Sequence, residues 1–327
     1  MHACNKWRRT ALGAALAGLA WTGTSMAIAK PYPEKSITLV VPYSTGGSAD
    51  AAARLISSKM SETLGQTIVV ENKTGATGRI AEDYVSGSRP DGYTILYHSF
   101  PYVINAAARM KASGGADSLK PVAMVTKAAM VLVVNANNKA KTLSDFVAEA
   151  RANPNKVSYA SFGVGSPAHL AGALLDQAAN VSMIHVPYKG GAPAVVDVLG
   201  GHVDSYFSNV ATAFPHLKSG KMRGLAVSSD TRIQALPDIP TVAESLNQPF
   251  DIIDWHGIFV PRGTPDEIVQ KLSKAVQKAM ADSHVRKTIT DLGVEPVFVD
   301  APQFPTWLAS EEKKWSKLIR DKNIQLN

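Results

Sequence analysis

Cysteine is almost absent from this chain of 327 residues, because Cys4 is its only one. A single thiol cannot close an internal disulfide, and no cysteine cluster is present that could hold zinc or an iron–sulfur cluster. Hydrophobic residues make up 45% of the chain and charged residues 19%, which excludes a disordered chain and a collagen-like repeat. No apolar run of about 18 residues follows residue 29, so we expect no membrane-spanning helix there.

The first 29 residues have the pattern of a secretory signal peptide. Lys6, Arg8 and Arg9 form a basic start, 11–20 is rich in alanine and leucine, and Ala29 ends an A-x-A cleavage site. We predict export with cleavage after Ala29, the alternative being an uncleaved membrane anchor. The adjacent arginines leave open whether export follows the general or the twin-arginine route.

Clusters of basic residues are also lacking once this segment is removed. The whole chain carries 34 Lys and Arg against 27 Asp and Glu, whereas residues 30–327 carry 31 against 27, a net charge of +4. Nucleic-acid binding requires clustered cations that displace counterions from phosphates, and no such stripe is present. We therefore exclude nucleic acid as a partner.

Strand-like and helix-like segments alternate along the rest of the chain, which predicts α/β layers with largely parallel sheets. In the segment that opens near residue 264, we expect Thr264 as the N-cap, Pro265 as the first helical residue and Glu267 completing a capping box. Strands are expected at 37–41, 67–71, 93–97, within 122–134, and at 157–161, 183–186 and 223–228; helices are expected at 49–64, 142–153, 166–179, 192–199, 264–281 and 304–319.

A Gly-Gly turn between a strand and a helix occurs twice in similar wording. The sequence 41–49 reads VPYSTGGSA, and 186–192 reads VPYKGGA. Glycine lets the backbone approach a ligand closely, and the N–H groups at a helix start favour an anion. A third turn, 161–167, places Ser166 as N-cap and Pro167 after it. Any one of these turns is explained as an ordinary connection between a strand and a helix, but three of them in one chain indicate a ligand cleft.

Sequence signatures of catalysis are missing. The chain has no G-x-S-x-G, no H-E-x-x-H and no phosphate-binding P-loop. The stretch 163–168 resembles a dinucleotide fingerprint, but no acid for the ribose lies between Asp176 and Asp197. We predict no enzyme, no catalytic residue, no metal and no cofactor. The alternative is an exported hydrolase that uses Ser48 or Ser166 with His98 or His169 as the base.

Motifs across nearly the whole exported chain resemble the Bug family, the exported substrate-binding receptors of tripartite tricarboxylate transporters. The matching stretches occur in the family's order and are VPYSTGGSAD (41–50), GQTIVVENKTGA (65–76), PDGYT (90–94), 161–170, HVPYKGG (185–191), LPDIPT (236–241), WHG (255–257) and PRGTP (261–265).

This resemblance implies an α/β, two-lobed periplasmic-binding-protein fold of the Venus flytrap type, each lobe being a mostly parallel sheet flanked by helices. Lobe I is expected at 30–125 plus 250–327, and lobe II at 126–249. The resemblance further implies a periplasmic monomer that binds a carboxylate through backbone N–H groups and delivers it to membrane transporter subunits. A ligand sensor that presents its closed form to a signalling partner is the alternative.

The expected ligand-binding residues lie in the turns and strands named above. Asp50 is expected to cap backbone N–H groups rather than to touch ligand, and Thr77 and His256 depart from the family's usual residues. The expected set is Tyr43, Ser44, Thr45, Gly46, Gly47, Ser48, Asp50, Thr77, His98, Ser99, Phe162, Gly163, Gly165, Ser166, His169, Tyr188, Gly190, Asp204 and Asn209.

The expected ligand is a dicarboxylate. Because six aromatic side chains are expected near the cleft, we expect an aromatic acid of the phthalate type as the ligand rather than a citrate-like or aliphatic acid. Each of these side chains except Tyr43 could equally belong to the hydrophobic core. These side chains are Tyr43, His98, Phe100, Tyr102, Phe162 and Phe207.

Overall fold

The computed structural model describes residues 32–106 and 118–325, so the predicted signal peptide and its cleavage site lie outside the described residues. Pro33–Asn327 form one compact unit. Its strands are β1 (Ile37–Val41), β2 (Ile68–Asn72), β3 (Thr94–Ser99), β4 (Leu119–Asn135), β5 (Ser158–Ser161), β6 (Ile184–Pro187), β7 (Ser205–Asn209), β8 (Met222–Val227), β9 (Ile253–Pro261) and β10 (Glu295–Val299).

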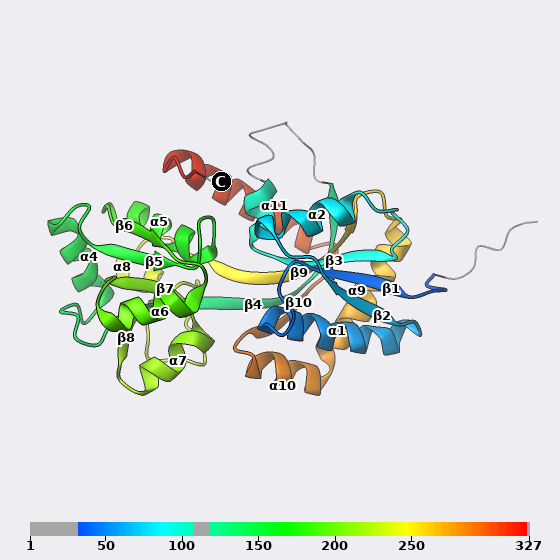
Figure 1. Ribbon diagram of the computed structural model, residues 1–327, viewed down its shortest axis with the longest axis horizontal. Helices are drawn as coiled ribbons and strands as arrows, with labels where there is room; N and C mark the ends of the chain where they lie inside the picture. Colours follow the sequence, from blue (N-terminus) through cyan, green and yellow to red (C-terminus); the bar gives the residue numbers. More distant parts are fainter. Residues whose placement is uncertain (1–31, 107–117, 326–327) are drawn as a thin grey trace, which may run out of the picture. The chain divides into compact units, whose positions relative to one another are not determined.

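Helices flank these strands (Figure 1). They are α1 (Ser48–Leu64), the 3₁₀ turn η1 (Ala76–Gly78), α2 (Arg79–Ser86), α4 (Leu143–Ala152), α5 (Pro167–Ala179), α6 (Gly191–Gly200), α7 (Val210–Lys218), α8 (Val242–Leu246), α9 (Asp266–Ala281), α10 (Ser283–Asp291) and α11 (Phe304–Asp321). Within the described ranges, no helix is both long and apolar enough to cross a membrane.

The strands form a mixed sheet in the order β2-β1-β3-β9-β4-β7-β5-β6, with β8 and β10 also paired to β4. The pairs β1–β2, β1–β3, β5–β6 and β5–β7 are parallel, as the β–α alternation predicts. All pairs made by β4 and β9 are antiparallel. Two parallel groups of strands are therefore joined through an antiparallel centre.

Strand β4 links the two groups because it changes partners along its length. Its first part, Leu119–Ala129, pairs with β9, and its last part, Met130–Asn135, pairs with β7 and β8. Figure 1 shows β4 and β9 running together between the two groups of helices. The lobe boundaries expected from the sequence stay a prediction.

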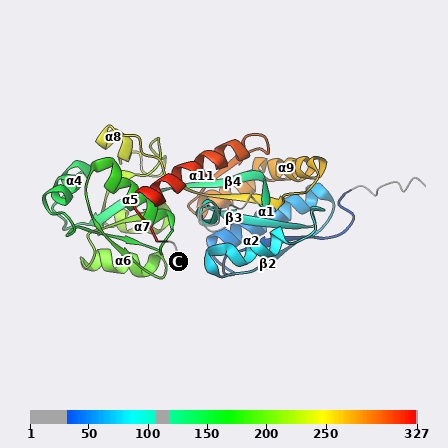
Figure 2. The same cartoon turned by 90° about the horizontal axis from the view of Figure 1, so that it is seen from above.

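The core beside this antiparallel centre is aromatic. The rings of Phe100 and Trp315 meet edge to face at 5.2 Å, and those of Trp255 and Phe304 meet at 5.7 Å. All four side chains are fully buried. Helix α11, which carries two of them, packs along β4 and can be followed in Figure 2. The helix expected at 304–319 is thus present as α11, and it packs on the core through its buried aromatic residues.

The helix starts follow local sequence signals, with one correction. Thr142 and Asp145 form a complete capping box at α4, and Ser166 caps α5. The prediction for Thr264 was wrong: α9 begins at Asp266 with Pro265 as its N-cap. The Thr264 hydroxyl instead donates to the carbonyl of Pro261 at 2.7 Å, which uses its proton in the preceding turn.

Candidate ligand-binding site

A cavity of about 440 Å³ lies where three helices begin. Ser48 lines it at the start of α1, Pro167 at the start of α5 and Thr212 in the first turn of α7. The first N–H groups of a helix lack intrahelical acceptors and carry about half a positive charge. The other described residues that line it are Tyr43, Ala49, Ser99, Pro101, Ala128, Phe162, Asn209, Ala211, Asp254, His256, Leu292, Gly293 and Val294, and no Lys or Arg is among them.

The turn before α1 leaves the start of this helix free of a side-chain cap. Gly47 is the N-cap and makes no side-chain hydrogen bond, while Gly46 has a left-handed φ of 86°. Asp50 accepts from the Gly46 N–H at 2.9 Å, and it also accepts from Arg54 and Asn72. Burial alone would raise the pKa of Asp50, but these hydrogen bonds outweigh it and lower that pKa to about 2. Asp50 thus holds the turn through the Gly46 N–H, and its expected role away from the ligand stays a prediction.

The polar side chains of the turn before α5 form hydrogen bonds within the turn itself. The Ser166 hydroxyl donates to the Gly163 carbonyl at 2.6 Å and accepts from the His169 N–H at 3.3 Å. His169 Nδ1 accepts from the Gly165 N–H at 3.1 Å. The proton of Ser166 therefore goes to a carbonyl rather than to an imidazole. A hydrolase needs the opposite arrangement, with a base that accepts the nucleophile's proton.

His169 also stacks on His185, with ring centroids 3.8 Å apart and planes 7° apart. Burial and the neighbouring ring lower the pKa of His169 to about 3, and burial lowers the pKa of His185 to about 4. Both rings are therefore neutral at pH 7. Ser161 contacts His185 Nε2 at 2.7 Å, but Ser161 is fully buried, so no substrate reaches this pair.

Tyr43 and Ser99 line the cavity and are held from behind by His98. The Tyr43 hydroxyl donates to Ser99 Oγ at 2.5 Å and lies 3.4 Å from His98 Nδ1. His98 Nδ1 accepts from the Ser99 N–H at 2.8 Å, and its Nε2 lies 2.9 Å from Glu82 Oε1. Nδ1 as an acceptor places the ring proton on Nε2, directed at Glu82. The histidine thus supports the wall rather than lining the cavity.

Asp254 and His256 of β9 continue this wall, since His256 pairs with Ser99 of β3 and its ring lies 5.9 Å from that of Tyr43. His256 Nδ1 lies 2.9 Å from Thr126 Oγ1, and its ring stacks on Tyr97 at 5.1 Å. Burial, with a smaller contribution from His98, lowers the pKa of His256 to about 3. Asp254 was not among the expected residues. A strand predicted at 253–261 would have found it, because residues two apart in a strand share a face.

Five expected residues line the cavity: Tyr43, Ser48, Ser99, Phe162 and Asn209. Ten more belong to the two turns or to β3, α1 and α5 without lining it: Ser44, Thr45, Gly46, Gly47, Asp50, His98, Gly163, Gly165, Ser166 and His169.

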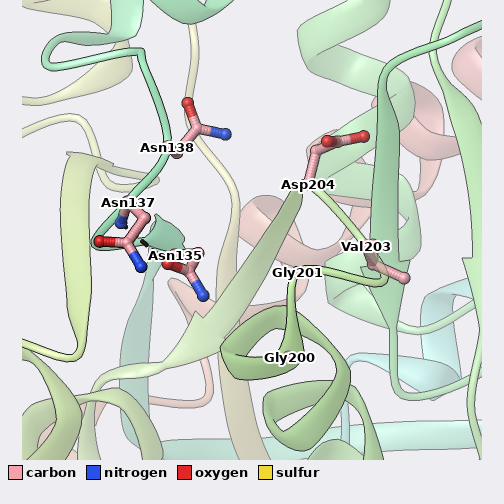
Figure 3. Close-up of a pocket in the computed structure, with 7 residues that line it drawn as sticks. All are labelled: Asn135, Asn137, Asn138, Gly200, Gly201, Val203 and Asp204. Atoms are coloured by element: carbon pink, nitrogen blue, oxygen red, sulfur yellow. Dashed lines mark hydrogen bonds between the residues drawn. The ribbon is translucent and has the colours of Figure 1, made fainter.

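The remaining four expected residues, Thr77, Tyr188, Gly190 and Asp204, do not line the cavity. The Thr77 carbonyl accepts from Asn105, and Tyr188 donates its hydroxyl to Asp197 at 2.6 Å while its backbone N–H donates to the Ser161 carbonyl. Asp204 accepts from the backbone N–H and the hydroxyl of Ser158, tying β5 to the start of β7. Figure 3 shows Asp204 in a separate pocket of about 290 Å³ with Asn135, Asn137, Asn138, Gly200, Gly201 and Val203.

Three of the aromatic side chains considered for the ligand belong to the core. Phe100, Tyr102 and Phe207 are at most 1% exposed, and none lines the cavity. Tyr43 and Phe162 do line it. Among the described residues, no group of three or more His, Cys, Asp or Glu side chains is arranged to hold a metal ion.

Comparison with known proteins places this geometry in a family. A family model described as "Tripartite tricarboxylate transporter family receptor" matches residues 52–324. A protein from the tcbD-tcbE intergenic region of Pseudomonas sp. strain P51 is 36% identical over 322 residues, covering 98% of this chain and 96% of that protein. Protein BugT of Bordetella pertussis is 33% identical over 301 residues, covering 91% and 92%.

Solved structures show the same fold. The structure of R. palustris Rpa4515 with adipate has a TM-score of 0.75 and 30% identity, and the match covers 90% of this chain and 99% of that chain. This likeness confirms the α/β periplasmic-binding-protein fold that the resemblance implied. The chain therefore belongs to the receptor family of the tripartite tricarboxylate transporters.

Proposed function

We propose that this protein is a periplasmic receptor that captures a small carboxylate, with a dicarboxylate as the expected class, in the cavity at the starts of α1, α5 and α7. It then delivers the ligand to the membrane subunits of a tripartite tricarboxylate-type transporter. The observation that carries the proposal is the convergence of three helix N-termini on a cavity that no Lys or Arg lines in the described part of the chain. Backbone N–H groups there favour an anion without a salt bridge.

Two further observations support binding rather than catalysis. The serine at the start of α5 donates its proton to a backbone carbonyl, and the one serine–imidazole contact near that turn is fully buried. The related structure with adipate also supports a carboxylate ligand. A sensor would use the same cavity, so the partner that recognises the loaded receptor separates sensing from transport.

Thermal unfolding of residues 30–327 against a panel of acids tests the proposal. The panel contains aliphatic dicarboxylates, citrate and phthalate, and the protein is first partly unfolded and dialysed to remove any bound ligand. A ligand at about 100 times its Kd adds about 2.7 kcal/mol, which for a chain of this size raises Tm by roughly 5–10 °C. A shift confined to one class names the substrate. A flat response from refolded protein across the whole panel would overturn the proposal.

A further inference from the structure

The wall formed by β9 is acidic. In the antiparallel register Ala128 of β4 lies opposite Asp254 of β9, and all of Ala128, Asp254 and His256 line the cavity. The neighbouring residues Lys127, Ala129 and Ile253 line a different cavity of about 1020 Å³. Because successive side chains of a strand point to opposite faces, Lys127 is directed away from Asp254. The nearest cation along the strand therefore cannot neutralise this carboxyl group.

The Asp254 carboxyl group has few partners within the protein. One oxygen accepts from the adjacent Trp255 N–H at 3.0 Å, and this is its only hydrogen bond among the described residues. Among the described residues, the ionisable side chains near it are Tyr43 from the β1–α1 turn, Tyr97 from β3 and His256 of β9 itself; burial raises the pKa of both tyrosines and lowers that of His256 to about 3, so all three are uncharged at pH 7. His98 of β3 lies behind Tyr43 and is hydrogen-bonded to Glu82 of α2. Within the described ranges, a half-buried acid thus faces the cavity without a cation in its lining.

A second hydrogen-bond acceptor faces the same cavity. Asn209, the N-cap of α7, lines the cavity, and its Oδ1 is buried without a hydrogen-bond partner in the described part of the chain. An unpaired buried acceptor is costly, whereas a ligand that brings N–H donors satisfies it. The two acceptors lie in a cavity that otherwise offers the N–H groups of helix starts. The cavity is therefore suited to a ligand that carries both an anion and a donor.

We propose that Asp254 binds a protonated nitrogen of the ligand, so that the substrate is an amino carboxylate. Its carboxylate lies at the helix starts and its ammonium group faces β9. This inference rests on the proposed function and narrows its substrate class. A ligand that presented only carboxylates would bring a like charge to Asp254, whereas an ammonium group forms a charge-assisted hydrogen bond with it.

The inference fixes the sign of a pH dependence. Burial raises the pKa of Asp254 to about 7, against the opposing effect of the Trp255 N–H. An ammonium group stabilises the ionised carboxylate and lowers this pKa, so binding releases a proton and is tightest above pH 7. A ligand that carries only carboxylates raises the pKa of Asp254 instead, so its binding is accompanied by proton uptake and is tightest below pH 7. An amino carboxylate should bind about tenfold more tightly at pH 8 than at pH 6.

Calorimetric titration of residues 30–327 with matched acids tests the inference. The pairs are succinate with aspartate, glutarate with glutamate, and adipate with 2-aminoadipate, each measured at pH 6 and pH 8. In at least one pair we expect the aminated acid to bind about 10- to 100-fold more tightly, the range of one charge-assisted hydrogen bond. Asp254→Asn keeps the shape of the side chain and removes the charge, so this preference and the pH slope should disappear.

The control is Asp83→Asn, which makes the same chemical change on the exposed face of α2 and should leave binding unchanged. Thermal unfolding verifies that both variants are folded. Plain acids that bind as well as their aminated partners, with affinity falling as the pH rises, would overturn the inference and leave the proposed function intact. Refolded protein that binds no carboxylate of either kind would overturn both.

Discussion

Removing Glu82 should loosen the wall of the cavity without touching the cavity itself. Glu82 of α2 is 1% exposed, and it accepts from His98 Nε2 at 2.9 Å and from Asn105 Nδ2 at 2.7 Å. His98 in turn accepts from the N–H of Ser99, whose hydroxyl receives the proton of Tyr43. The carboxylate is therefore two contacts away from the residues that line the cavity.

The expected loss in the free energy of unfolding of Glu82→Ala follows from two opposing effects. Each hydrogen bond to a charged group contributes about 1.5–3 kcal/mol, and Glu82→Ala leaves the buried His98 Nε2–H without this acceptor, whereas Asn105 keeps its hydrogen bond to the Thr77 carbonyl. Removing the carboxylate also relieves its desolvation penalty, which is several kcal/mol. We expect a net loss of about 2–3 kcal/mol, which lowers Tm by roughly 5–10 °C. Glu82→Gln keeps an acceptor for His98 and should cost about 1 kcal/mol.

The matched control is Glu311→Ala in α11. Glu311 is 5% exposed, accepts from the Trp315 indole N–H at 2.7 Å and pairs with Lys314, so it is a comparable buried acid away from the cavity. Both alanine variants should lower Tm, but only Glu82→Ala should weaken the affinity for the ligand. A Tm change below about 1 °C in Glu82→Ala, or equal losses of affinity in the two variants, would refute this reasoning.

Two further predictions concern the turn after α10 and the stacked histidines. Gly293 has a φ of 80°, and a Cβ there would lie 2.2 Å from the Cβ of Ala211 on the cavity wall, so Gly293→Ala should lower both Tm and ligand affinity. Gly220 has a similar φ of 66°, but a Cβ there would meet open space, so Gly220→Ala should lose only the backbone strain of about 1–2 kcal/mol in stability. Equal losses of Tm and affinity in the two variants would rule out the clash. The depressed pKa values of His169 and His185 contribute stability that is full above about pH 6.5 and is lost as the pH falls towards 4 and 3. Tm measured from pH 7.5 to 4.5 should therefore fall less steeply in His185→Asn than in the native protein, and identical slopes would contradict this. The buried carboxyl groups of Asp176 and Asp254 have raised pKa values and change the stability in the opposite sense. They are present in both proteins, so the difference between the two Tm curves reports the stacked histidines alone.

Local signals in the sequence were sufficient for most helix starts and for the turns that precede them. Gly65 at the end of α1, the capping box at Thr142 and the Ser166-Pro167 start of α5 act within one helical turn, so neighbouring residues decide them. Thr264 failed as an N-cap because a carbonyl three residues earlier took its hydroxyl proton. Motifs spread over the chain likewise identified the family before any contact was known.

The membership of the cavity was decided by tertiary structure. The two VPY turns have similar sequences, but Tyr43 of the first lines the cavity, whereas Tyr188 of the second does not and is bonded to Asp197. Asp254 lines it because the antiparallel pairing of β4 with β9 turns this face of the strand inward, and the same pairing directs Lys127 away. By itself the sequence determined the α/β alternation, the starts of helices such as α4 and α5, and the family, because those depend on short-range hydrogen bonding and backbone conformation. Only the long-range strand register and burial decided which side chains share the cavity and what charge they bring to it.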